Sequence, residues 1–127
     1  MIGVDVNSSE ILDVSIEILE SKKMFKQVFR EFYDTCINLD KKYFAQKGKK
    51  LEIGAGVSFF KKIYPEIISS DIKKAKHLDM EVNAQNMCFE NDSVGAIYGI
   101  NCFHHFPDPS KFFEELKRVL VKNGGCI

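Results

Sequence analysis

The stretch Leu51-Glu52-Ile53-Gly54-Ala55-Gly56 places two glycines directly after a short apolar run. A strand that ends in such a turn lets a ligand approach the backbone, because glycine carries no side chain and accepts a positive φ. Asp71 ends the next apolar run. In a doubly wound sheet the two strand ends are neighbours, and a carboxylate there can accept hydrogen bonds from both hydroxyls of a ribose. The pattern predicts nucleoside binding, with a purely structural turn as the alternative.

Short apolar runs alternate with helical or polar stretches on either side of this turn. We expect strands at residues 50–53, 67–70, 80–83 and 94–100, and helices at residues 58–64 and 109–121. Two helices should precede them, one at residues 8–20 that starts at Asn7, and one whose aromatic stripe from Phe25 to Cys36 packs in the core. This order predicts an α/β fold, a Rossmann-like doubly wound and mostly parallel sheet with helices on both faces.

The length favours one domain, residues 1–127, with an N-terminal helical cap at 1–47 and a ligand-binding core at 48–127. Eighteen basic residues balance eighteen acidic ones, which argues against nucleic acid or an anionic membrane as a partner. The four cysteines form no CxxC pair and stand in apolar contexts, as expected in a reducing cytoplasm. Neither a signal peptide nor a membrane helix is indicated, so we expect a cytoplasmic protein.

Four segments, in the expected order, resemble class I S-adenosylmethionine-dependent methyltransferases. Glu52-Ile53-Gly54-Ala55-Gly56-Val57-Ser58 is similar to their first motif, with Ser58 in place of a last glycine. Ala84-Gln85-Asn86-Met87-Cys88-Phe89, followed by Asp92-Ser93-Val94, resembles their "DA..LPF..SFD" segment. Ile100-Asn101-Cys102-Phe103-His104-His105 resembles "LHH", and Arg118-Val119-Leu120-Val121-Lys122-Asn123-Gly124-Gly125 resembles "RvLkpGG".

This resemblance implies S-adenosyl-L-methionine as the cofactor. Glu52 would help to bind its ammonium group, the turn of Gly54, Ala55 and Gly56 would meet its methionine part, and Asp71 would hold the ribose. Around the adenine the resemblance places Ile72, Asn83, Ala84, Gln85 and Met87. Asn101 would lie near the methionine or the transferred methyl group. For Glu52, Met87 and Asn101 a structural role is the alternative.

Three positions depart from the family's pattern. Asn83 stands where many relatives have aspartate, and Gly95 replaces the aspartate of "SFD". The connection from Asp71 to Val82 is too short for a full crossover helix. We therefore expect the adenine wall to be built differently.

His104 and His105 follow the fourth expected strand and are the candidates for a general base if the acceptor is a hydroxyl or an amine. Alternatively, one histidine packs and the other caps the loop. We expect no metal site, since adjacent histidines should point apart and no third ligand stands at suitable spacing.

The resemblance also implies a sheet that continues beyond a fifth strand into an antiparallel hairpin. We expect the fifth strand to begin at Cys126, so the hairpin would be missing and the unpaired sheet edge would favour self-association. The expected function is methyl transfer to an unidentified acceptor, with a small molecule favoured. A non-catalytic adenosylmethionine-binding or assembly module is the alternative. An NAD-dependent oxidoreductase is less favoured because Phe59 occupies the third glycine position of G-x-G-x-x-G.

Overall fold

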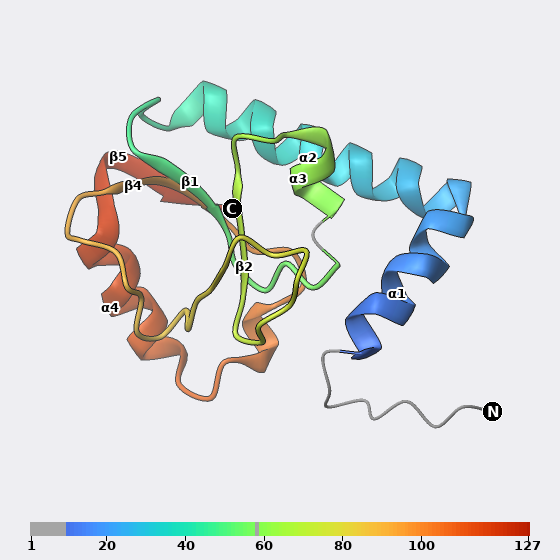
Figure 1. Ribbon diagram of the computed structural model, residues 1–127. Helices are drawn as coiled ribbons and strands as arrows, with labels where there is room; N and C mark the ends of the chain where they lie inside the picture. The colour runs from blue at the N-terminus through green and yellow to red at the C-terminus, as the bar shows by residue number, and fades with distance from the viewer. Residues whose placement is uncertain (1–9, 58) are drawn as a thin grey trace.

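The computed structural model describes residues 10–57 and 59–127, so the expected helix start at Asn7 lies outside the described residues. The helices are α1 (Glu10–Ser21), α2 (Lys23–Tyr43), α3 (Phe59–Ile63) and α4 (Pro109–Val119), with a 3₁₀ turn, η1, at Phe103–His105 (Figure 1). The strands are β1 (Lys49–Glu52), β2 (Ile68–Asp71), β3 (Met80–Glu81), β4 (Val94–Tyr98) and β5 (Leu120–Cys126). None of these helices combines the length and apolar character needed to traverse a bilayer.

The five strands form one sheet in the order β3-β2-β1-β4-β5, and every neighbouring pair is parallel. The chain therefore winds outward from β1 in one direction to β3 and then returns to β4 on the other side. This confirms the doubly wound Rossmann-like class. The connection from β2 to β3 contains no helix, in agreement with its short length.

Side chains on the two faces of the sheet belong to two separate apolar clusters. Leu51 and Ile97 pack on one face with Phe112 of α4. Tyr98 packs on the opposite face with Phe60 of α3 and with the C-terminal half of α2. Because successive residues of a strand point to opposite faces, the short apolar strands can serve both clusters.

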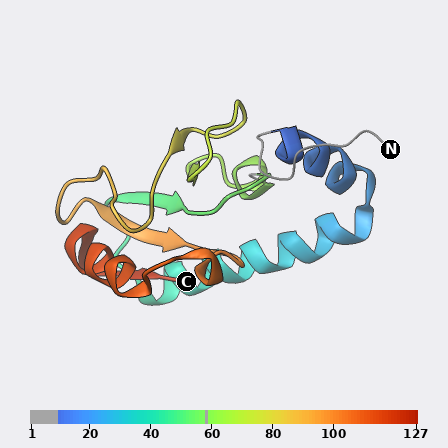
Figure 2. The ribbon, with the colours of Figure 1, turned by 90° about the horizontal axis from the view of Figure 1, so that it is seen from below.

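The aromatic stripe of α2 is buried only in part, so the expectation that it packs in the core is wrong for its N-terminal half. Tyr33 and Cys36 are buried, whereas Phe25, Val28 and Phe32 are exposed. The reason is visible in Figures 1 and 2, where α1 and the first half of α2 extend past the strands. The helix is longer than the sheet it covers.

The expected boundary between the last helix and the fifth strand is wrong. α4 ends at Val119, and β5 begins at Leu120, which pairs with Val94 of β4. Asn123 has a φ of +63° and lies at an irregularity in this pairing, before Gly125 pairs with Ala96. The Asn-Gly-Gly segment is therefore a bend within β5 and not a helix cap.

Gly95 is required by the packing of β4. A Cβ on this residue would lie 2.1 Å from the carbonyl oxygen of Lys47, in the segment that leads into β1. Glycine at this position therefore permits a close crossing of two backbone segments that a side chain would block.

The cysteines differ in their surroundings. Cys36 and Cys102 are buried, whereas Cys88 and Cys126 are exposed. β5 lies at one edge of the described sheet, and self-association through that edge stays a prediction.

Candidate functional site

A cavity of about 390 Å³ opens at the carboxyl edge of β1, β2, β3 and β4. Nine of the residues selected from the sequence line it: Gly54, Gly56, Asp71, Ile72, Asn83, Ala84, Gln85, Asn101 and His105. The other lining residues are Ile53, Lys73, Val82, Cys102, Phe106 and Pro107. After β1 the chain continues to β2 on one side, and after β4 it continues to β5 on the other side. The cavity therefore lies at the switch point at which α/β sheets bind ligands.

The two glycines of the turn after β1 are needed for different reasons. Both have positive φ, +60° at Gly54 and +52° at Gly56. A Cβ on Gly54 would also lie 2.5 Å from Cβ of Cys102, whereas a Cβ on Gly56 would meet no atom within 4 Å. Gly54 therefore permits the turn to pack against the loop after β4, and Gly56 leaves its backbone open toward the cavity.

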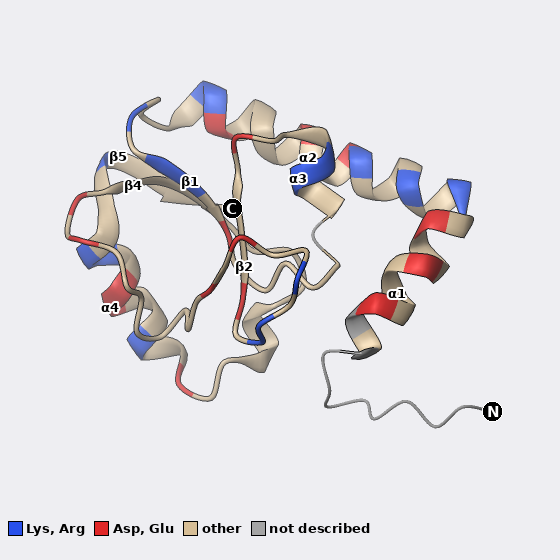
Figure 3. Cartoon of the chain, viewed as in Figure 1, with Lys and Arg blue, Asp and Glu red and all other residues tan. Residues whose placement is uncertain are grey.

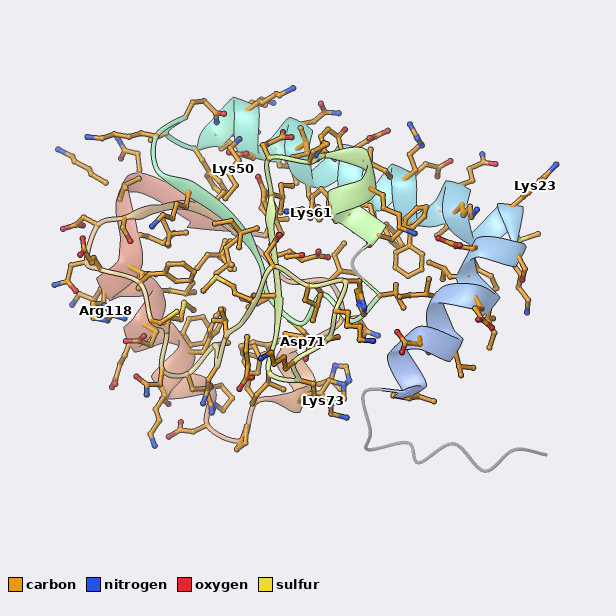
Figure 4. The ribbon with its side chains drawn as sticks, in the orientation of Figure 1. Lys23, Lys50, Lys61, Asp71, Lys73 and Arg118 are labelled. Atoms are coloured by element: carbon orange, nitrogen blue, oxygen red, sulfur yellow. The ribbon has the colours of Figure 1, made fainter. Side chains whose placement is uncertain are left out.

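Asp71 holds this turn from the end of β2. Its Oδ2 accepts a hydrogen bond from the N–H of Gly56 at 3.0 Å, and its Oδ1 accepts one from the N–H of Lys73 at 3.2 Å. Figure 4 shows Asp71 and Lys73 at the same end of the sheet. An ionised carboxylate accepts about four hydrogen bonds, so Asp71 can still accept from two ligand hydroxyls.

Glu52 is the last residue of β1 and is only 3% exposed. Within the described part of the chain, its Oε2 has no hydrogen-bond partner. Burial, with a smaller contribution from the charge of Asp71, raises the pKa of Glu52 to about 8. A buried carboxyl group without a cation partner is costly, and such groups are common at functional sites.

Gln85 lines the cavity and makes hydrogen bonds with the two loops that follow β3 and β4. Its backbone N–H donates to Oδ1 of Asn83 at 2.9 Å, which shapes the turn after β3. Its side-chain Oε1 accepts from the N–H of Asp108 at 2.7 Å, immediately before α4. Gln85 therefore ties the loop after β3 to the loop after β4.

The loop after β4 carries Asn101 and both candidate histidines. Asn101 has a φ of +55°, a conformation that asparagine adopts more readily than most residues. His104 and His105 are exposed, and only His105 lines the cavity. Their ring centroids are 3.9 Å apart, so the expectation that the rings point apart is wrong. Among the residues described, no three side chains form a metal-binding group.

Four of the selected residues do not line the cavity. Met87 is buried in the apolar cluster, its N–H bonded to Oε2 of Glu115, which agrees with the structural alternative. Ala55 is buried, and its N–H donates to the carbonyl of Ser70. Glu52 lies beneath the turn and His104 beside the site. Whether any of these positions contacts a ligand stays a prediction.

Sequence reasoning missed His77, in the connection between β2 and β3. Its Nε2 lies 2.6 Å from the carbonyl oxygen of Gly56. No local pattern marks this histidine, because its partner lies 21 positions earlier in the chain. It also missed Lys73, although that residue directly follows Ile72.

An all-parallel sheet with a glycine turn, a carboxylate on the next strand and a cavity at the switch point is typical of α/β proteins that bind a nucleoside. The methyltransferase domain family matches residues 51–127. The chain belongs to this family, which confirms the resemblance of the sequence to methyltransferases.

Several solved structures share this fold. A protein of Methanococcus maripaludis, described as an S-adenosyl-L-methionine-dependent methyltransferase, has a TM-score of 0.68 and 15% identity over 96% of this chain. A protein of Thermotoga maritima, described as a SAM-dependent methyltransferase, has a TM-score of 0.59 and 17% identity over 89% of this chain. The chain spans 65% of the first protein and 58% of the second. No curated protein sequence matches it significantly.

Proposed function

We propose that this chain binds S-adenosylmethionine in the cavity beside Gly56 and Asp71 and transfers its methyl group to an acceptor. The observation that carries the proposal is the unpartnered Oε2 of Glu52 beneath the glycine turn. Together with Asp71 it gives the site two carboxyl groups, Glu52 with an unpartnered oxygen and Asp71 bonded to the N–H groups of Gly56 and Lys73. One suits an ammonium cation and the other a pair of ribose hydroxyls.

The residues present fit the cofactor. Glu52, once ionised, would hold the ammonium group, directly or through water. Gly54 and Gly56 would let the methionine part approach the backbone, and Asp71 would orient the ribose. Ile72, together with Val82 and Ala84, would supply apolar surface for the adenine. Asn101 would lie near the reacting end.

When bound, adenosylmethionine supplies a methyl group on a sulfonium that is already activated for transfer. The protein then contributes mainly positioning. His105 is the candidate base, because it lines the cavity and could accept the proton that a hydroxyl or amine acceptor loses. His104 would support its orientation through the close ring contact.

The acceptor is proposed to be a small molecule. A second cavity of about 370 Å³ shares Ile53, Cys102 and Phe106 with the first. Its remaining lining is also apolar and includes Phe103 and Phe113. This volume favours an acceptor with an apolar body. A cytoplasmic location likewise stays part of the proposal.

Calorimetric titration with S-adenosylhomocysteine tests the proposal. Saturable binding at one site per chain is expected, and an excess of NADH should not compete. Absence of binding by a chain with a cooperative thermal transition would contradict the proposal. Competition by NADH would favour the oxidoreductase alternative instead.

A further inference from the structure

The connection between β2 and β3 is a loop of residues 72–79 in place of a crossover helix. It supplies Ile72 and Lys73 to the cavity wall. Figure 3 shows the run of basic residues on this loop, and Lys73, Lys74 and Lys76 are all exposed. A loop without regular structure needs specific anchors if its wall residues are to keep one position.

Both ends of this loop are anchored to β2. At its start, Asp71 accepts the N–H of Lys73. At its end, the N–H of Asp79 donates to the carbonyl of Ser69 at 3.0 Å, while Oδ2 of Asp79 accepts the N–H of Ser69 at 2.8 Å and also contacts Lys61. These bonds fix the loop relative to its own strand. They do not fix its middle relative to the glycine turn.

His77 makes that connection. Its Nε2 lies 2.6 Å from the carbonyl oxygen of Gly56, and a carbonyl only accepts, so Nε2 carries the hydrogen. Within the described residues, Nδ1 is buried and has no partner. Among the described residues, the ring of His77 therefore makes its polar contact with Gly56 through Nε2.

Both backbone polar groups of Gly56 are therefore hydrogen-bonded. Its N–H donates to Asp71, and its carbonyl accepts from His77. Gly56 has a positive φ, and no atom lies within 4 Å of the position that a Cβ would occupy. Contacts at that position therefore do not fix the conformation of this residue. The two hydrogen bonds are what orient the backbone that faces the cavity.

We propose that His77 is a positioning residue for the cofactor site. It joins the middle of loop 72–79 to the glycine turn, so that the cavity wall formed by Ile72 keeps one position relative to Gly56. His77 does not line the cavity and would act through Gly56. The effect on affinity rests on the proposed function, whereas the effect on the turn does not.

Two substitutions separate the hydrogen bond from the bulk of the ring. His77→Phe keeps a ring and removes the donor, whereas His77→Gln keeps an N–H donor. Lys76→Ala is the matched control, because Lys76 is exposed in the same loop. The dissociation constant for S-adenosylhomocysteine should rise about five- to tenfold in His77→Phe, the loss expected for one hydrogen bond. It should stay within about threefold of the unmodified chain in His77→Gln and Lys76→Ala.

The turn itself is measured on the ligand-free chain by nuclear magnetic resonance. The carbonyl carbon and amide signals of Gly56 should shift in His77→Phe and return toward their original positions in His77→Gln. Unchanged Gly56 signals in His77→Phe would overturn the proposal, as would equal affinities of His77→Phe and the unmodified chain. If the unmodified chain does not bind S-adenosylhomocysteine, the proposed function fails, and the Gly56 signals still decide the role of His77.

Discussion

The hydroxyl of Tyr98 donates a hydrogen bond of 2.6 Å to Oδ2 of Asp40, and both residues are completely buried. Asp40 belongs to α2 and Tyr98 to β4. The same carboxylate also pairs with Lys50 of β1 at 2.5 Å and accepts from Gln46 at 3.0 Å. This network attaches the C-terminal end of α2 to the central strands β1 and β4.

Tyr98→Phe should lower the free energy of unfolding by about 1.5 to 3 kcal/mol, because a buried carboxylate loses one of its donors. Urea denaturation followed by circular dichroism measures the change. Tyr43→Phe is the matched control, since Tyr43 is the last residue of α2, the helix that contains Asp40, and is 62% exposed. Equal midpoints for the two variants would show that the bond to Asp40 contributes little.

The same network predicts sensitivity to acid. Burial raises the pKa of Asp40, but hydrogen bonds from Lys50, Tyr98 and Gln46 outweigh burial, so that its pKa lies below the ordinary value of 3.8. The unfolded chain then binds the proton more tightly than the folded chain. The contribution of Asp40 is present above about pH 4 and is lost as the pH falls through its folded pKa. The stability difference between the unmodified chain and Asp40→Asn should therefore shrink as the pH is lowered from 6 to 2.

The raised pKa of Glu52 predicts that ligand binding depends on pH. With a pKa of about 8, this carboxyl group is mostly protonated at pH 6 and must lose its proton to hold an ammonium group. The dissociation constant for S-adenosylhomocysteine should fall by up to about tenfold per pH unit between pH 6 and 8, the limit for one ionisation. Titrations in buffers of different ionisation enthalpy would detect the released proton. Glu52→Gln should bind more weakly and lose this slope.

The same residue predicts the opposite effect on the ligand-free chain. Because the folded pKa lies above the ordinary value of 4.5, the folded chain binds the proton of Glu52 more tightly than the unfolded chain, and stability falls as the pH rises from about 4.5 to 8. Glu52→Gln removes this loss. Its thermal midpoint should exceed that of the unmodified chain by more at pH 8 than at pH 5, as measured by scanning calorimetry. A constant difference would show that the carboxyl group ionises normally.

Asp71→Ala should weaken the binding of S-adenosylhomocysteine by about 1.5 to 3 kcal/mol, because the charged hydrogen bonds proposed between Asp71 and the ribose would be lost. Asp71→Asn should lose less, since its amide oxygen can still accept from Gly56. Glu81→Ala serves as the control on the neighbouring strand, where Glu81 is exposed. An unchanged affinity in calorimetric titration of Asp71→Ala would remove this residue from the site.

Gly95→Ala should destabilise the chain by about 3 kcal/mol or more, because the added methyl group would overlap the Lys47 carbonyl. Lys47→Ala retains that carbonyl and should have little effect. Thermal melting of both variants provides the comparison. A normal midpoint for Gly95→Ala would mean that the segment before β1 can move away.

The sheet and the glycine turn could be predicted because their signals are local. Leu51 to Gly56 contains both the strand and the residues that end it, and Asp71 ends the next strand in the same way. The sequence does not predict where β5 begins, because Asn123 and the glycines after it are also typical of a helix end. Pairing with β4 overrides that local preference, and only the tertiary structure shows it.

The parts that sequence could not supply depend on distant partners. The periodicity of α2 shows which face is apolar, but not that the sheet ends before Phe25 and Val28. His77 carries no motif, and its role depends on a contact with Gly56. The sequence marks Gly95 as a departure from the family's pattern, but only the structure shows that the backbone of Lys47 leaves no room for a side chain there.

The loop that replaces the crossover helix leaves Ile72 63% exposed at the mouth of the cavity. A nucleoside base that stacks on this side chain would remove apolar surface from water, and such burial gives a negative heat-capacity change on binding. Cofactor association should therefore become more exothermic as the temperature rises. Ile72→Ser should reduce that temperature dependence, so the solvent exposure of one isoleucine becomes a thermodynamic marker of base docking.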